Sequence, residues 1–217
     1  MAVVSSEGTA DDGSSNPSDS DGLNDKSALR KQLRAAMDGI SSATRHAKSV
    51  AACSLLSATA EFAQARVVML FVSTDIEVDT MPLALKCWQS GKTVVVPKVS
   101  WDQKRMLPVE ITSLQTGMTT TGNGIREPIG GKPVPVEFID LVVVPGLGFT
   151  RTGHRIGRGM GFYDRFLGGT DFVGVSCGLA FEEQIVADLP VMSHDVHMSM
   201  LATDGGIRRF SVNCIRT

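Results

Sequence analysis

Apolar residues recur along the chain in two patterns, one typical of helices and one typical of buried strands. Leu29, Leu33 and Met37 follow one another at four-residue spacing, which predicts a helix that buries one face. Continuous apolar runs such as RVVMLFVS at 66–73 instead predict strands that are covered on both faces, as in parallel sheets. The two patterns alternate, and this alternation predicts an α/β fold with a largely parallel sheet.

The pattern also places the individual elements. The first helix is expected to begin near Asp25, a suitable N-cap. Further helices are expected at 41–63, 80–91 and 161–168, and strands at 66–73, 92–99, 138–149, 172–181 and 196–204. The strand at 92–99 is expected to close at Pro97. Between 101 and 135, short polar–apolar alternation and many turn residues predict irregular or antiparallel structure.

The N-terminal segment differs in composition from the rest of the chain. Residues 1–24 are rich in Ser, Asp and Gly and bury too little apolar surface to offset the conformational entropy lost on folding, so we expect a disordered acidic tail. Residues 1–25 carry six acidic residues and no Lys or Arg. The remaining residues, 25–217, are of a length that suits a single domain with a substantial core.

Charge and cysteine content limit the classes of function. The net charge of −2 argues against a general nucleic-acid binder, while the body outside the tail is net positive, which is compatible with a small anionic ligand. No apolar run is long enough to span a membrane, and the N-terminus resembles neither a secretory signal nor a mitochondrial presequence. The four cysteines form no C-x-x-C pair and are expected to be free thiols in a reducing compartment. We therefore expect a cytoplasmic protein.

The segment GHRIGRGMGFYDRF at 153–166 follows an apolar run that ends in a turn. Ligands of open parallel sheets bind beyond the carboxyl ends of the strands, and glycine-rich backbone lets N–H groups approach an anion closely. Arg155 and Arg158 could add bidentate bonds to phosphate oxygens. The spacing is neither that of a Walker A motif nor that of a Rossmann fingerprint. A surface turn with solvated arginines is the alternative.

Three further groups of residues could carry chemistry. Asp164 stands near the start of the helix at 161–168, where it is either an N-cap or a Mg²⁺ ligand. The segment SHDVH at 193–197 lacks further zinc ligands at suitable local spacing, so a solvated loop is its simplest interpretation. The acidic loop STDIEVDT at 73–80 follows the first strand, so one of its carboxylates is a candidate ligand group.

Several motifs together resemble one known family. They are KSALR, EVDT, VPKV, GIREP, PGLGFTRTGHRIGRGMGFYDRFL, LAFEEQIV and LPVMSHD. In this order, from about residue 26 to residue 196, they resemble the 5-formyltetrahydrofolate cyclo-ligase family, also called methenyltetrahydrofolate synthetase. The element Gly-Arg-Gly-x-Gly-(Phe/Tyr)-Tyr-Asp is highly specific, whereas the short outer motifs would be weak alone.

The resemblance implies a fold and a reaction. The fold would be an α/β three-layer sandwich with a mostly parallel central sheet, of the type shared with sugar-phosphate isomerases and CoA transferases. The reaction would be the ATP- and Mg²⁺-dependent conversion of 5-formyltetrahydrofolate to 5,10-methenyltetrahydrofolate, with release of ADP and phosphate. The partners would be small molecules only, with no nucleic acid and no membrane, and the protein would be a monomer.

The resemblance also assigns site residues, position by position. For ATP it implies Lys26, Arg30, Arg155, Ile156, Gly157, Arg158, Gly159, Met160, Gly161, Phe162 and Tyr163. For the folate it implies Val72, Glu77, Arg158, Gly159, Met160, Gly161 and Phe162. For Mg²⁺ it implies Asp164 and Asp195.

Two positions depart from the family pattern. Before GIREP the family usually has an aromatic residue that packs on the folate, and this chain has Asn123. After HDV an acidic residue is common, and this chain reads HMSM. Asn123 leaves open a non-catalytic paralogue that binds nucleotide or folate, and an ATP-dependent enzyme acting on a different small amide is a third alternative.

Overall fold

A seven-stranded, mostly parallel sheet forms the centre of the protein, whose computed structural model describes residues 17–121 and 124–211. The strand order is β12-β11-β9-β6-β1-β2-β3, and only the two edge strands, β12 and β3, are antiparallel to their neighbours. The helices are α1 (Pro17–Asp38), α2 (Ser42–Ser57), α3 (Ala60–Gln64), α4 (Met81–Gln89) and α5 (Phe162–Leu167). The sheet strands are β1 (Val67–Met69), β2 (Thr93–Ser100), β3 (Arg105–Ile111), β6 (Leu141–Val144), β9 (Val175–Ala180), β11 (Met200–Thr203) and β12 (Gly206–Arg209).

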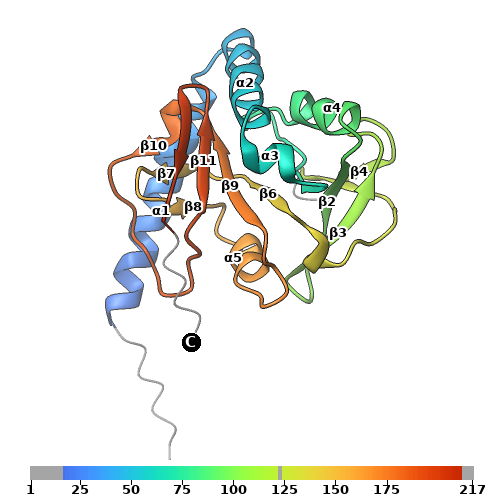
Figure 1. Ribbon diagram of the computed structural model, residues 1–217. Coiled ribbons are helices and arrows are strands. Elements are labelled where there is room, and N and C mark those ends of the chain that lie inside the picture. Colours follow the sequence, from blue (N-terminus) through green and yellow to red (C-terminus); the bar gives the residue numbers. More distant parts are fainter. Residues whose placement is uncertain (1–16, 122–123, 212–217) are drawn as a thin grey trace, which may run out of the picture.

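Helices cover both faces of this sheet, which makes a three-layer arrangement. Figure 1 shows α2, α3 and α4 on one face and α5 on the other. Successive strand residues alternate between the two layers: Val68 packs with Leu56 of α2, whereas Met69 packs with Leu167 of α5. Because both faces are buried, the inner strands β1 and β6 are apolar at every position, which is the pattern that the sequence shows. The predicted α/β fold with a largely parallel sheet is confirmed.

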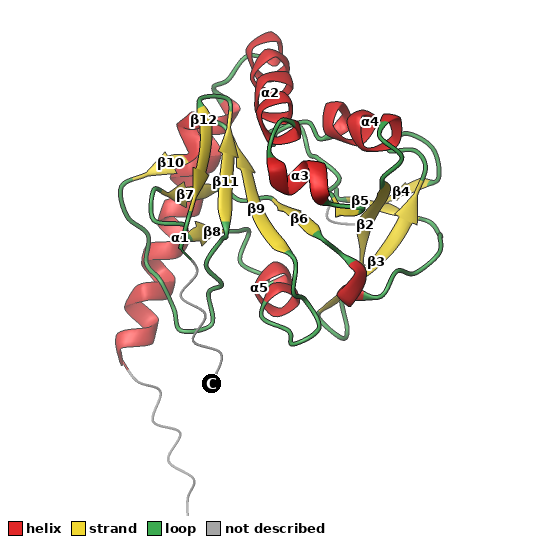
Figure 2. Cartoon of the chain, in the orientation of Figure 1, coloured by secondary structure: helices red, strands yellow, loops and turns green. Residues whose placement is uncertain are grey.

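Two smaller sheets flank the central one (Figure 2). One contains β10 (Ile185–Val186), β7 (Gly148–Thr150) and β8 (Arg155–Ile156), and the other contains β4 (Met118–Thr120) and β5 (Arg126–Pro128). Helix α1 packs beside the first, where Leu33 joins a buried cluster with Leu147, Ile156 and Leu189. This packing brings the N-terminal helix next to the glycine-rich segment.

Some predicted boundaries differ from the structure. Helix α1 begins at Pro17 rather than Asp25, and proline suits the first turn of a helix because its missing N–H would have no partner there. The predicted helix at 41–63 is two helices, since the Thr59 hydroxyl accepts a hydrogen bond from the Phe62 N–H and begins a new helix. Residues 1–16 lie outside the described residues, so the expected acidic tail is covered only from Pro17 onward.

Pro97 does not end its strand. Strand β1 pairs with β2 only as far as Met69 and Val95, so beyond that point β2 has a neighbour on one side alone, β3. Pro97 stands opposite Pro108 in that pair, and its missing N–H interrupts no bond to β1. Strand β2 therefore continues to Ser100. The antiparallel structure expected between 101 and 135 is confirmed by β3, β4 and β5.

The remaining predicted strands are found in shortened form. The predicted strand at 138–149 begins with the last residue of a short 3-10 turn, Val136–Phe138. It then divides into β6 and β7, because the chain leaves the strand at Pro145 and bends at Leu147. Strands β9 and β11 lie within the predicted 172–181 and 196–204. Within residues 17–121 and 124–211, no helix has both the length and the apolar character needed to cross a membrane.

Candidate active site

A cavity of about 480 Å³ lies at the carboxyl ends of β1, β2 and β6. This is the edge of an open α/β sheet where ligands are expected, and the volume is that of a typical small-molecule site. The loop after β1, the turn after Ser100 and the turn after Val144 all contribute lining residues. Helix α1 and the segment 155–164 complete the cavity on the side of the small sheet formed by β10, β7 and β8.

Two walls of different chemistry line the cavity, and different elements build them. We call the first the charged wall; its residues are Lys26, Arg30, Arg155, Arg158, Asp164 and Asp195. We call the second the apolar wall; its residues are Phe71, Val72, Val99, Trp101, Met106, Ile125 and Phe162. The charged wall comes from α1, the glycine-rich segment and the loop before β11. The apolar wall comes mainly from the loop after β1 and from strands β2 and β3.

Three of the four cations of the charged wall are already paired with carboxylates, and the fourth, Arg30, donates to the Gly157 carbonyl. Lys26 Nζ lies 2.6 Å from Asp195 Oδ2, and Arg155 Nη2 lies 2.7 Å from Asp164 Oδ1. Both side chains of the first pair are largely buried, and Arg155 is only 5% exposed. Burial on its own would raise the pKa of Asp195, but the hydrogen bond from Lys26 and its charge outweigh this and lower that pKa. Asp195 therefore stays ionised in the ligand-free protein.

The two carboxylates predicted to bind Mg²⁺ lie close together. The Val196 N–H donates to Asp164 Oδ1 at 3.4 Å, so the residue after Asp195 touches Asp164. Asp164 does not cap α5, because the N-cap position is Gly161, and the N-cap alternative for Asp164 is wrong. The Asp164 carboxylate instead faces Arg155 and the cavity.

Arg158 crosses the cavity to the loop after β1. Its Nη2 donates to Glu77 Oε1 at 2.9 Å and to Thr74 Oγ1 at 2.8 Å. The other oxygen of Glu77 accepts hydrogen bonds from the N–H and the hydroxyl of Thr74. Arg158 therefore joins the residue predicted to bind folate, Glu77, to the loop predicted to bind ATP.

The glycine-rich loop adopts a conformation that other residues rarely reach. Gly159 has φ +101° and Gly161 has φ +63°, both in the region that favours glycine. A Cβ on Gly159 would also lie 3.3 Å from the guanidinium carbon of Arg30, which donates from Nε to the Gly157 carbonyl. The loop thus packs directly against Arg30 of α1, and the close approach of its N–H groups to an anion stays a prediction.

Two buried polar atoms of the cavity-lining residues lack a partner. They are Arg155 Nε and the Tyr163 hydroxyl. Burial raises the pKa of Tyr163, so the hydroxyl remains a neutral donor at physiological pH. Buried polar groups without partners are rare in native proteins, and at a cavity they indicate groups that a ligand satisfies.

Nucleophilic chemistry by cysteine has no support here. Of the described cysteines, none lines the cavity, and Cys53, Cys87 and Cys177 are all buried. Burial raises the pKa of both Cys53 and Cys87 to about 12, so these thiols stay protonated. They pack in the core as small apolar side chains.

Every site residue that the resemblance assigned lines this one cavity, from Lys26 to Asp195. Their individual roles stay predictions. The other acids of the loop at 73–80 do not line it, and Asp79 instead accepts from the Met81 N–H. Asn123 lies outside the described residues. In GIREP, Ile125 lines the cavity, while the buried Glu127 accepts from the Val99 N–H, so this motif also supports β2.

Sequence reasoning missed most of the apolar wall. Trp101 and Met106 lie in the segment that the sequence indicated only as irregular or antiparallel, while Val99 and Phe71 lie in apolar runs that read as buried strands. The available signal was a tryptophan placed directly after a strand, at the edge where ligands bind.

The carboxylates fit a bound Mg²⁺ in partnership with phosphates. Among residues 17–121 and 124–211 no group of three His, Cys, Asp or Glu side chains could hold a metal ion alone. Mg²⁺ commonly takes only one or two carboxylates, and the phosphates of its substrate supply further oxygens. Asp164 and Asp195 meet that requirement, since both are hard oxygen donors on one cavity.

The comparisons with known proteins all indicate one family. The model of the 5-formyltetrahydrofolate cyclo-ligase family matches residues 23–204. The 5-formyltetrahydrofolate cyclo-ligase of Mus musculus is 28% identical over 181 residues, which cover 79% of this chain and 89% of that protein. The 5-formyltetrahydrofolate cyclo-ligase of Escherichia coli K12 is 31% identical over 142 residues, which cover 64% of this chain and 78% of that protein.

Solved structures show the same fold. The solution structure of Aquifex aeolicus 5,10-methenyltetrahydrofolate synthetase matches with a TM-score of 0.75 and 30% identity, covering 86% of this chain and 93% of that one. A Mycoplasma pneumoniae 5,10-methenyltetrahydrofolate synthetase matches with a TM-score of 0.68 and 21% identity, covering 83% of this chain and 99% of that one, and supports the fold alone.

Proposed function

The chain belongs to the 5-formyltetrahydrofolate cyclo-ligase family, and we propose that its cavity converts 5-formyltetrahydrofolate to 5,10-methenyltetrahydrofolate with consumption of ATP. The formamide oxygen of the substrate is a poor leaving group. In the proposed reaction this oxygen attacks the γ-phosphorus of ATP, and ADP leaves. The neighbouring arylamine nitrogen then attacks the formyl carbon and gives up its proton, the ring closes, and phosphate departs with the former formyl oxygen.

The charged wall supplies what phosphoryl transfer requires, which is positioning and charge stabilisation. When ATP enters, the guanidinium of Arg158 and the ammonium of Lys26 exchange carboxylate partners for phosphate oxygens. Arg155, which is buried and has a free Nε donor, stays in place as a preorganised cation. The N–H groups of the glycine-rich loop contribute further donors to the phosphates.

Asp164 and Asp195 would hold the Mg²⁺. When bound, the ion would neutralise charge on the triphosphate. With the ion bound there, Asp195 would keep a cationic partner after Lys26 moves to the phosphates, and Asp164 would keep its pair with Arg155. Each carboxylate of the charged wall therefore has a defined use both before and after ligands bind.

The apolar wall faces the folate in this proposal. Val72 and Phe162 contact its rings, and Glu77 accepts hydrogen bonds from its N–H groups. Apolar side chains around the reacting carbon also exclude water, which would otherwise compete with the arylamine nitrogen for the activated formyl group. The Tyr163 hydroxyl, which is buried and without a partner, donates to an oxygen of the bound substrates.

The observation that carries the proposal is the pairing of Arg158 with Glu77 across the cavity. In the proposal Arg158 contacts phosphate and Glu77 contacts the folate, and their separation of 2.9 Å supports direct transfer between the two substrates. A binding protein without turnover would need both sites but no such proximity.

The test is a direct assay. Purified protein mixed with 5-formyltetrahydrofolate and Mg-ATP should show growing absorbance at the band of the methenyl product, and none when ATP is omitted. If both ligands bind but no product forms, the non-catalytic paralogue is the correct interpretation. Turnover with another N-formyl compound, and none with 5-formyltetrahydrofolate, would identify the different small amide.

We further propose a cytoplasmic monomer that acts on small molecules. The buried free thiols Cys53, Cys87 and Cys177 suit a reducing compartment. Cell fractionation tests the compartment, and light scattering of the purified protein tests the oligomeric state.

A further inference from the structure

The hairpin of β2 and β3 extends beyond the edge of the central sheet. Strand β1 ends at Met69, opposite Val95, whereas β2 continues to Ser100 and pairs there only with Arg105 of β3. Trp101 follows directly, at the turn of this hairpin. The extension therefore places a tryptophan at the rim of the cavity, which begins where β1 ends.

Arg165 of α5 ties this turn to the glycine-rich loop. Its Nε donates to the Lys104 carbonyl at 2.9 Å, and its Nη2 donates to the Met160 carbonyl at 2.7 Å. Its guanidinium carbon also lies 5.4 Å from the centre of the Phe162 ring. One side chain thus holds the hairpin turn, the loop and the aromatic ring in a fixed arrangement.

Trp101 and Phe162 form an aromatic corner in the cavity. Their ring centres are 5.3 Å apart with planes at 90°, so the corner presents two perpendicular surfaces. Both rings are partly exposed and line the cavity, next to Val99 and Met106. The other tryptophan, Trp88, packs against the core cluster from α4 and does not line the cavity. Core packing therefore accounts for Trp88 but not for Trp101.

We propose that Trp101 is a specificity-determining residue that stacks on the pterin ring of the folate, an inference that rests on the proposed function. Phe162 directly follows the loop that meets the phosphates, so the ring in this corner is the one that carries the formyl group. A flat heteroaromatic ring gains dispersion and quadrupole contacts from an indole face. Trp101 thereby supplies an aromatic surface in a chain whose position 123 is Asn. Arg165 acts as a positioning residue that keeps Trp101 against Phe162.

Fluorescence tests this contact directly, because the chain has only two tryptophans. In Trp88→Phe, emission comes from Trp101 alone, and we expect 5-formyltetrahydrofolate to quench it with a saturable curve. In the matched variant Trp101→Phe, emission comes from Trp88 alone, and we expect no saturable change. Free N-acetyltryptophanamide in the same titration corrects for absorption by the ligand. Absence of saturable quenching in an active Trp88→Phe would overturn the proposal.

Fragments identify the ring. A reduced pterin without the aminobenzoyl group should quench Trp101 in Trp88→Phe, whereas 4-aminobenzoylglutamate should not. The reverse result would refute the assignment to the pterin.

Steady-state kinetics test the specificity role. Stacking of a nucleobase on an aromatic side chain corresponds to roughly 5- to 100-fold in binding, so Trp101→Leu should raise the KM for 5-formyltetrahydrofolate by about that factor. The KM for ATP should change less than about twofold, and Trp101→Phe should recover most of the loss. Leu107→Ala is the control, since Leu107 is 48% exposed on the same hairpin and does not line the cavity.

The outcomes separate this inference from the proposed function. An inactive parent protein would refute the function. If the parent is active and Trp101→Leu keeps the parental KM for the folate, only the stacking role is refuted. If Trp101→Leu raises the KM for both substrates equally and lowers the Tm, Trp101 has a structural role only.

Discussion

The charged wall and the apolar wall of the cavity differ in the partners that their side chains have before any ligand binds. Lys26, Arg155 and Arg158 each have a carboxylate partner, so this wall is electrostatically satisfied before any ligand arrives. Trp101 and Phe162 are partly exposed rings that contact each other and Arg165, and no carboxylate has to leave them before a ligand binds. The charged wall must therefore exchange partners to bind phosphates, whereas the apolar wall binds by covering a surface that is already formed.

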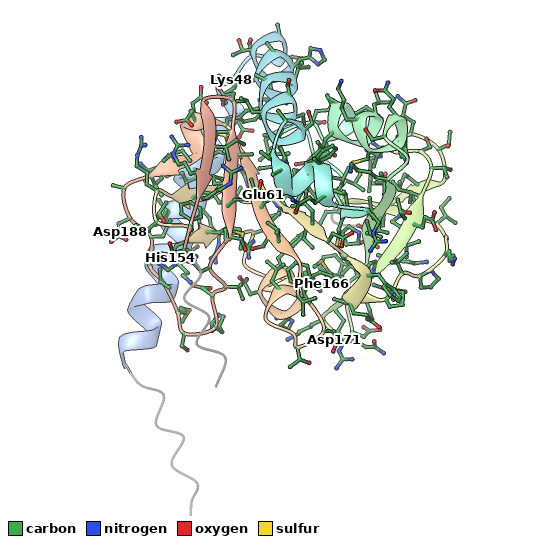
Figure 3. All side chains as sticks on the ribbon, viewed as in Figure 1. Lys48, Glu61, His154, Phe166, Asp171 and Asp188 are labelled. Atoms are coloured by element: carbon green, nitrogen blue, oxygen red, sulfur yellow. The ribbon has the colours of Figure 1, made fainter. Side chains whose placement is uncertain are left out.

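This difference separates rate from affinity. Charges that meet the reacting phosphoryl group act most strongly in the transition state, so their loss should lower kcat. Apolar contacts remain similar in substrate and transition state, so their loss should raise the KM of the folate. Ion pairs outside the cavity should have neither effect. Examples are Glu61 with Arg209 and Lys48 with Asp204, which tie α3 and α2 to β12 and its turn; Figure 3 labels Glu61 and Lys48.

Asp164→Asn should have the largest effect. The amide cannot supply the anionic oxygen that Mg²⁺ requires, and we expect kcat to fall on the order of 100-fold or more. The amide oxygen can still accept from Arg155, so the Tm without ligands should fall only slightly. Asp171→Asn, an exposed carboxylate beyond α5 that Figure 3 labels, is the control and should keep full activity. Parental kcat in Asp164→Asn would remove this residue from the charged wall.

Arg158→Ala comes next in size. Loss of a bidentate donor to phosphate should lower kcat/KM for ATP roughly 10- to 100-fold, mainly through kcat, in an assay at saturating folate. Arg158→Lys should recover little, because an ammonium cannot reproduce the fork of a guanidinium. The neighbouring exposed Arg151→Ala, which does not line the cavity, should behave as the parent. Full recovery by lysine would refute bidentate binding.

Glu77→Gln tests the bridge between the two walls. Arg158 loses its ion pair and no longer has to leave a carboxylate, so we expect ATP to bind about 2- to 5-fold more tightly by calorimetry. The folate should bind about 10-fold more weakly, since a charged acceptor is replaced by a neutral one. Opposite shifts for the two ligands would show that Glu77 serves both walls. Weaker binding of both would mean that it only holds the loop through Thr74.

Lys26→Met should have the smallest effect, a loss of thermal stability whose size depends on pH. The pKa of Asp195 lies below its usual 3.8, so the stability due to this ionised carboxylate is present above that pH and is lost as the pH falls through the lowered pKa. Without Lys26 the pKa rises, and that stability is lost at higher pH. We expect Tm curves of the parent and the variant, both without ligands, to differ by about 2–4 °C more at pH 5 than at pH 2. A difference independent of pH would contradict this linkage.

The sequence by itself determined the α/β class and the charged wall. Apolar runs and helical spacing are local patterns, and burial on both faces of a sheet requires them. The glycine-rich segment 153–166 could likewise be read from its composition, because glycine adopts the positive φ angles of Gly159 and Gly161 without the steric cost that other residues meet. Boundaries were less certain, as the break at Thr59 and the continuation of β2 through Pro97 depend on which neighbours are present.

Only the tertiary structure decided how the walls are assembled. Lys26 and Asp195 meet although 169 positions separate them, and Arg158 meets Glu77 across 81 positions. Trp101 faces Phe162 because β2 extends beyond the end of β1 and because Arg165 links the turn between β2 and β3 to the glycine-rich loop. No local pattern encodes such contacts. The type of a side chain determines its charge, and its spacing along the chain indicates whether it is buried. Its partner depends on where the sheet ends and which strand continues past that edge.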